Sequence, residues 1–215
     1  MRQHIQNERG SMAILTVWTL TIVAIMLILV VNIAKLYVVK EQAALAAEQA
    51  SIAASSVVVE EVKQVVDHYI DPDAPPGAKT LKEKVTEQRN MLIGHHGMTA
   101  SEAYVEALNV VLPQEATYDS DLRDELVDAM NSAVYRMPSV VGNIITENHG
   151  KRSDTTIYVL NSQQRIEVET TVRFEKSHYS GMHLGQDEDV PQKGMGPELR
   201  FVSSLPWSSP PIQLP

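Results

Sequence analysis

The feature that most constrains this chain is an apolar run near its N-terminus, MAILTVWTLTIVAIMLILVV, from Met12 to Val31. Its only polar residues are three threonines, whose hydroxyls can hydrogen-bond to the backbone of their own helix. At about 1.5 Å per residue the run spans roughly 30 Å, which is the thickness of the hydrocarbon core of a bilayer. The sequence therefore predicts a transmembrane helix over residues 12–34.

The charges around this run predict its orientation. Arg2 and Arg9 precede it, so the positive-inside rule places residues 1–11 in the cytoplasm as a short tail and the rest of the chain outside the cell membrane. Lys35 and Lys40 weaken this asymmetry. Two alternatives are a signal peptide cleaved after 44–46 (Ala-Leu-Ala) and a core helix of a soluble domain. The length of the run argues against both, because signal-peptide cores have about 7 to 15 residues and soluble domains seldom bury so long a run.

Composition excludes several classes of function. The chain has no cysteine, so it forms no disulfides and no thiolate metal sites. Its formal net charge of −9 opposes contact with a phosphate backbone. Two tryptophans and two phenylalanines offer few rings for stacking against bases. We therefore expect no nucleic acid among its partners.

The membrane helix is expected to continue into solvent as an extracytoplasmic extension over residues 35–71. No glycine or proline appears after Lys35 until Pro72, and residues with high helix propensity dominate. The segment DPDAPPG, residues 71–77, then ends the helix.

One narrow stripe of this extension predicts a helix-packing interface. Alternating steps of three and four residues place seven side chains on one face. They are Leu36, Val39, Ala43, Ala46, Ala50, Ala53 and Val57. Alanine at the contact positions lets two helix backbones approach closely. The face can pack either on a partner helix or on the globular domain of the same chain, and both remain open at this stage.

The first quarter of the chain resembles TadE/TadG-like proteins, which are membrane components of the tight-adherence (Flp) pilus assembly system. The matching residues, with the spacing of the family, are Arg9-Gly10, Asn32, Lys35-Leu36-Tyr37, Gln42 and Ala46-Ala47-Glu48. The chain departs from the family pattern at two positions, because Asn32 and Glu48 stand where the family has Asp. Asn32 keeps the capacity to hydrogen-bond across a helix interface without a charge.

The resemblance also implies a candidate processing site between Gly10 and Ser11. Pilins similar to this family are cut after such a glycine and carry Glu at the fifth position beyond the cut. That position here is Leu15, which has no carboxylate. We therefore expect an uncut or inefficiently cut protein that acts in or beside the assembly machinery.

Residues 72–206 are expected to form an α+β extracytoplasmic domain. Helical spacing predicts helices at 79–93, 99–112 and 119–137, with Pro113 and Pro138 at the ends of the last two. Thr99 or Ser101, and Ser120, are the expected N-caps.

Strict alternation of apolar and polar residues predicts a strand at 165–175. Further strands are expected at 154–160, around 199–202 and at 140–146, giving an antiparallel sheet of three to four strands packed on the long helix in a pilin-like plan. Residues 180–196 are predicted to form a mobile loop, and residues 207–215 a flexible tail.

No motif for catalysis appears in the sequence. It lacks the nucleophile elbow, the phosphate loop and the dinucleotide fingerprint. His95 and His96 are adjacent but belong to no helix-borne ligand set, so we expect no metal and no cofactor.

We therefore expect a structural, non-catalytic, single-pass membrane component of a Tad/Flp-type pilus or related secretion assembly. Its partners would be the membrane and other membrane subunits of the apparatus, with a second copy of the chain also open. The alternative is a membrane-tethered extracytoplasmic ligand-binding domain.

The retained anchor is testable by mass spectrometry of the intact protein isolated from membranes. We expect a mass that includes the apolar run, because the run is too long for a signal-peptide core. A mature N-terminus near Ala47 would show that the anchor is removed, and one at Ser11 would show cleavage at the candidate processing site.

Overall fold

The computed structural model describes residues 8–174, 178–179, 182–183 and 188–215. The cytoplasmic tail predicted at 1–11 therefore lies largely outside the described residues. The helices are α1 (Glu8–His68), α2 (Leu81–His96), α3 (Ala100–Tyr118), α4 (Ser120–Glu147) and the 3-10 helix η1 (Arg200–Ser204). The strands are β1 (Gly150–Tyr158), β2 (Arg165–Phe174), β3 (His178–Tyr179), β4 (Met182–His183), β5 (Glu188–Glu198) and β6 (Ile212–Gln213). The predicted α+β class is confirmed.

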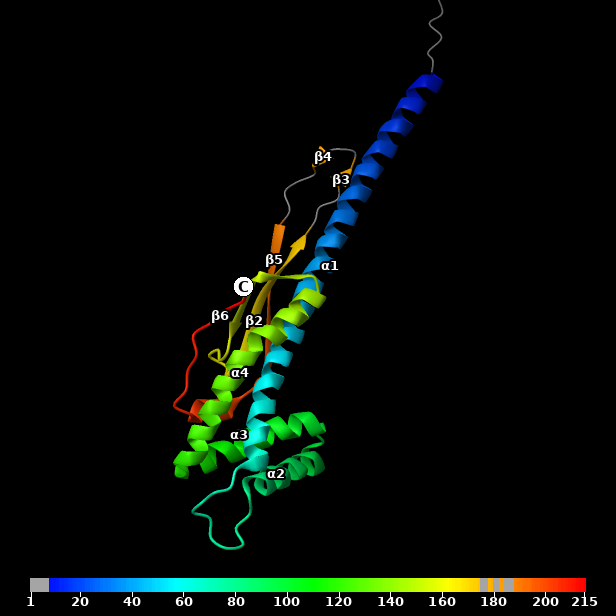
Figure 1. The fold of residues 1–215 in the computed structure, drawn as a ribbon. Helices are drawn as coiled ribbons and strands as arrows, with labels where there is room; N and C mark the ends of the chain where they lie inside the picture. The colour runs from blue at the N-terminus through cyan, green and yellow to red at the C-terminus, as the bar shows by residue number, and fades with distance from the viewer. Residues whose placement is uncertain (1–7, 175–177, 180–181, 184–187) are drawn as a thin grey trace, which may run out of the picture.

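Helix α1 is a single rod of 61 residues. Its N-terminal end projects beyond the rest of the described chain, and the other helices and the main sheet gather around its C-terminal half, with β3 and β4 drawn farther toward the N-terminal end (Figure 1). It ends at His68, three residues before the predicted end. The rod therefore joins the apolar run to the domain without a break.

The main sheet is antiparallel and has the order β5-β2-β1-β6. Helix α1 packs against β2 and β5, and α4 packs against α1 and β1. Along β2 the buried residues are Ile166, Val168, Thr170 and Val172. This confirms the strand predicted from alternation, with one face toward the core.

The contact between α1 and β5 is made backbone to backbone. A Cβ atom added at Gly194 would lie well under 3.0 Å from the backbone of Ala47 and Glu48, and one added at Gly196 would collide with Ser55 Oγ. The facing side chains of α1 are small, and Ala47, Ser51 and Ser55 are almost fully buried. Only glycine fits on the strand at this distance from the helix.

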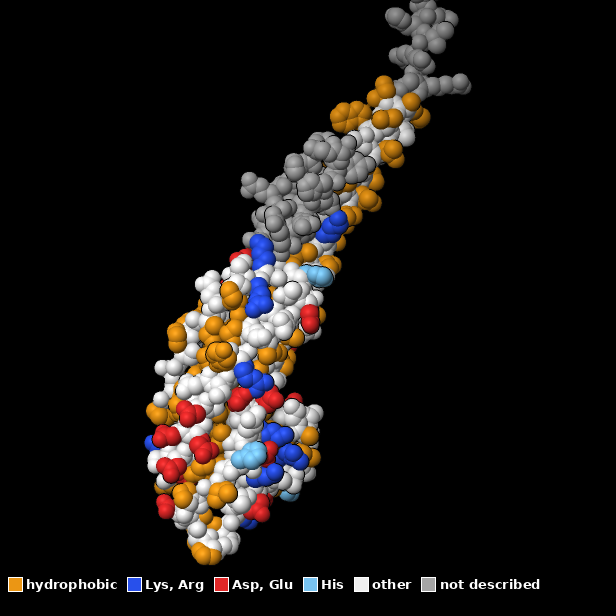
Figure 2. All heavy atoms as spheres, in the orientation of Figure 1, with side chains coloured by type: hydrophobic (Ala, Val, Ile, Leu, Met, Phe, Trp, Pro, Cys, Tyr) orange, Lys and Arg blue, Asp and Glu red, His pale blue; other side chains and the backbone are white. Residues whose placement is uncertain are grey.

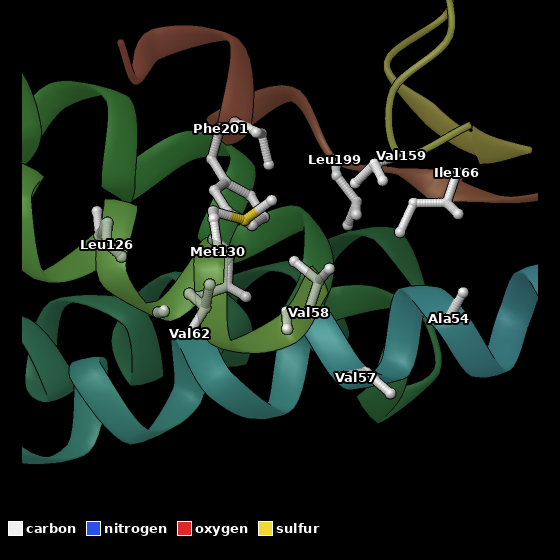
Figure 3. Close-up of a cluster of buried hydrophobic side chains, with 14 of the residues drawn as sticks. Ala54, Val57, Val58, Val62, Leu126, Met130, Val159, Ile166, Leu199 and Phe201 are labelled. Atoms are coloured by element: carbon white, nitrogen blue, oxygen red, sulfur yellow. The ribbon is translucent and has the colours of Figure 1, made fainter. Parts of the chain in front are cut away.

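Beyond this contact, larger side chains fill the core. Val58 and Val62 of α1 lie toward Met130 of α4, with Leu199 and Phe201 closing the cluster (Figure 3). All five are buried. Removal of such side chains from water is the main stabilising contribution to a domain of this size.

Side-chain caps fix where the outer helices begin. Thr80 and Glu83 form a capping box at α2, and Thr99 and Glu102 form one at α3, as predicted for Thr99. At α4 the N-cap is Asp119 and not the predicted Ser120, because Asp119 Oδ1 accepts the Leu122 N–H at 3.0 Å.

Three predictions about the helices are wrong. Pro113 and Pro138 lie inside α3 and α4 instead of ending them, and residues 140–146, predicted as a strand, continue α4. Each proline removes one backbone hydrogen bond. The apolar face of α4 nevertheless continues past Pro138, with Val141 and Ile145 fully buried, and this burial favours continuation of the helix.

Three predictions about the C-terminal region are also wrong. Residues 200–202 belong to η1 and Leu199 is its N-cap, so residues 199–202 form no strand. The segment predicted as a mobile loop at 180–196 contains β4 and most of β5, while residues 180–181 and 184–187 lie outside the described residues. The predicted tail at 207–215 contains β6, which pairs with β1, and its Leu214 is buried. Glycine and proline suggested loops, but prolines are compatible with an edge strand such as β5.

The backbone contact between α1 and β5 can be tested with Gly194→Ala. We expect a loss of about 1–3 kcal/mol in the free energy of unfolding, because the added methyl overlaps the backbone of α1. Denaturation of the purified full-length protein in detergent measures it.

The matched control is Gly94→Ala in α2, where an added Cβ meets nothing within 4 Å. This change should leave stability equal or raise it by up to about 1 kcal/mol, because alanine favours the helix. Equal effects of the two substitutions would contradict the close contact.

Candidate functional site

The N-terminal half of α1 presents apolar side chains on every side. All residues from Met12 to Val31 are exposed, and the most apolar window of the helix has none of its residues buried within the structure. Figure 2 shows hydrophobic side chains along this projecting end, while acidic and most basic side chains gather over the domain. By length and composition this segment can cross a membrane once.

The three threonines of this segment do not interrupt its apolar surface. The hydroxyls of Thr16, Thr19 and Thr21 donate to the carbonyl oxygens four residues earlier, at 2.9, 2.9 and 2.8 Å. Each polar hydrogen is therefore satisfied within the helix, as hydrocarbon surroundings require. The local chemistry fits a single transmembrane helix.

The predicted packing stripe is divided between two environments. Ala43, Ala46, Ala50 and Val57 are buried within the chain itself, and Ala53 is half-buried. Of the two alternatives, the burial of these positions favours packing on the domain of the same chain, where α1 contacts α4 and the sheet. In this part of α1 the stripe therefore belongs to the core of the domain.

The membrane-proximal residues of the stripe are more accessible. Leu36 is 39% exposed, whereas Asn32 and Val39 are half-buried. Gly10 and Ser11 lie in the first turns of α1, and their side chains lie outside the described residues. A partner helix could reach Leu36 but not the alanines that follow it.

A second exposed face of α1 was not predicted from the sequence. Val38, Leu45 and Ile52 are spaced by seven residues and are 52%, 48% and 48% exposed. We call these three residues the outer ridge. Its signal in the sequence is the seven-residue repeat, which is easily overlooked beside the more numerous alanines. The outer ridge faces away from the residues that bury α1 in the domain.

A cavity of about 290 Å³ lies at the end of the domain farthest from the apolar run. Tyr69, Lys84, Glu115 and Asp119 line it. The Tyr69 hydroxyl donates to Asp119 Oδ2, and Lys84 Nζ lies 2.7 Å from Glu115 Oε2. Its polar groups are therefore paired with one another and do not converge on an empty centre, as they would in a ligand site.

The hydrogen bond between Tyr69 and Asp119 supports the fold of the domain. Burial, with the hydrogen bond to Asp119 and the nearby acidic charges, raises the pKa of Tyr69 far above its usual range. Burial acts to raise the pKa of Asp119, but the hydrogen bonds from Leu122 N–H and Tyr69 oppose it, and the net shift is downward. The pair joins the end of α1 to the start of α4.

The histidines singled out in the sequence lie at a helix end. His95 and His96 are the last residues of α2 and are exposed. Within the described ranges, no three His, Asp or Glu side chains come close enough together to hold a metal ion.

Comparison of the chain with protein-family models, with curated proteins and with solved structures finds no match. The function is therefore inferred from α1, from the domain that surrounds its C-terminal half, and from the polar residues around the apolar run.

Membrane insertion of the apolar run can be tested with the double substitution Ile22→Arg and Ile25→Arg. Each arginine near the centre of a spanning helix costs about 2.5–3.5 kcal/mol on translocon scales, so we expect the protein to leave the membrane fraction.

The control is Leu45→Arg combined with Ile52→Arg, at positions that are about as exposed on the same helix but lie beyond the span. This variant should stay in the membrane fraction after carbonate extraction. If both variants leave the membrane fraction, or if both stay in it, the assignment of the span is wrong.

Proposed function

We propose that this protein is a structural, single-pass membrane component of a Tad/Flp-type pilus or related secretion assembly. The observation that carries the proposal is the continuity of α1, one 61-residue helix that is apolar and unburied at one end and forms the core of a domain at the other. The N-terminus lies in the cytoplasm and the domain outside, following the positive-inside rule.

The rigidity of the rod supports a structural role. No glycine or proline interrupts the sequence from Ser11 to Asp71, and the helix enters the domain through backbone contacts rather than through a flexible linker. The domain is therefore held at a fixed height and rotation relative to the membrane. A tethered receptor needs only a linker that is long enough to reach its ligand, and a flexible linker serves equally well.

The resemblance to TadE/TadG-like proteins supplies the class of assembly. It rests on the ordered polar residues around the apolar run, including Arg9-Gly10 and Lys35-Leu36-Tyr37. The partners proposed on this basis are the membrane and other membrane subunits of the same apparatus.

The cavity beside Tyr69 and the hollow beside α2 do not favour the ligand-binding alternative. The cavity beside Tyr69 has its polar groups paired. The more open hollow beside α2 is lined by residues of that single helix, including Lys82, Asn90 and His95. Neither offers polar groups converging from several elements, which is the usual mark of a binding site.

The proposed role can be tested by breaking the rod without changing its length. Replacing Val39, Lys40 and Glu41 by three glycines weakens the helix by about 3 kcal/mol relative to three alanines. We expect the glycine variant to lose assembly of the pilus or secretion complex in the host bacterium and the alanine variant to keep it.

Expression and membrane retention of both variants serve as controls. Assembly at the normal level with three glycines would contradict a rigid structural role and would favour a tethered domain that acts independently of the rod.

A further inference from the structure

The outer ridge remains uncovered although the opposite side of the same helix is fully packed. On the packed side, Ala46, Ala47 and Ala50 have no exposed surface, while the outer-ridge residues keep about half of theirs. The sheet lies along the packed side (Figure 1). The outer ridge therefore presents apolar side chains that no other described element covers.

The seven-residue spacing of the outer ridge is the repeat with which helices pair. Seven residues correspond to almost two full turns, so the three side chains form a nearly straight column that can follow a partner through a slight left-handed supercoil. The column continues toward the membrane at Val31, and then at Ala24 and Val17 within the span, each seven residues apart. Small and β-branched residues there allow close helix contact in the bilayer.

We propose that the outer ridge pairs two copies of this chain as parallel rods, with Val38, Leu45 and Ile52 meeting their counterparts. This inference rests on the proposed membrane anchoring. A shared bilayer holds two copies at the same height and in the same orientation, so identical residues meet in register. A partner with a different anchor would have to supply its own matching repeat at the same height.

The polar flanks of the outer ridge are compatible with a symmetric pair. Glu41 and Glu48 lie on one flank only, so a twofold axis parallel to the rods places the two glutamate columns on opposite edges of the contact. Gln42 and Gln49 lie on the other flank, and Gln49 Oε1 accepts a hydrogen bond from Asn148 Nδ2 at 3.1 Å. Uncharged amides therefore border the apolar column on the side of α4.

The size of the contact makes the pair dependent on the membrane. One apolar residue in seven forms a narrower seam than the two columns of a full coiled coil. Such a contact is below the roughly 1,200 Å² typical of stable complexes in solution. Confinement in a bilayer raises the effective concentration, so the pair forms there and dissociates when detergent dilutes the protein.

Thiol cross-linking in native membranes tests the pairing, because the chain has no cysteine of its own. Single substitutions V38C, L45C and I52C are compared with Y37C and K40C, which are exposed positions on a different side of α1. With a short bis-maleimide we expect about fivefold more dimer from the three ridge positions, since their side chains meet across the seam. Co-expression with a longer tagged copy should give a dimer of intermediate mass.

A second substitution separates a specific seam from random collision. Adding Ile52→Lys to V38C should lower cross-linking at Val38 about fivefold, because two lysines would then face each other in the seam. Adding Ile70→Lys, at an exposed position beyond the end of the rod, should leave it unchanged.

Equal cross-linking at all five positions, no dimer at any of them, or products that contain only another polypeptide would overturn the pairing. These readouts do not depend on pilus assembly. Loss of assembly in the triple-glycine variant together with uniform cross-linking would therefore reject the pairing and keep the proposed function.

Discussion

The backbone contact between α1 and β5 is the interaction on which the rest of the structure depends. Gly194 and Gly196 bring the strand against the backbone of α1 beside Ala47 and Ser55. A contact this close sets both the height and the rotation of the sheet on the helix, because only the glycines of β5 leave room for the backbone of α1. Small residues along α1 are therefore explained first by the packing of the domain itself.

This contact gives one helix two different surroundings. Toward its N-terminus α1 is apolar on all sides and its threonine hydroxyls bond internally, which suits lipid. Toward its C-terminus the same helix is the central element of a soluble core, joined to α4 by side chains such as Val58 and Met130. Because no break separates the two parts, any displacement of the anchor is transmitted directly to the domain.

Local patterns predicted the apolar run, the α+β class and the strand at β2, because each depends on the periodicity of neighbouring residues. The wrong predictions share a different cause, which is packing between distant parts of the chain. Residues 140–146 are rich in β-branched side chains, yet they continue α4 because burial against α1 and β1 outweighs intrinsic preference. Likewise Gly194 and Gly196 suggested a loop, and only the approach of α1 reveals that they are strand residues in close contact. Long-range packing of this kind leaves no local signal in the sequence.

The continuity of α1, from the apolar run into the core of the domain, underlies both the anchor and the fold. Its most direct test is an electron–electron double resonance distance between spin labels at Val31 and Ile52, in full-length protein reconstituted in lipid and diluted with unlabelled protein. A continuous helix predicts one narrow distribution near about 32 Å, from a rise of about 1.5 Å per residue. A broad distribution, or a shorter main distance, would show a hinge at the membrane surface and would mean that α1 is not one continuous rod.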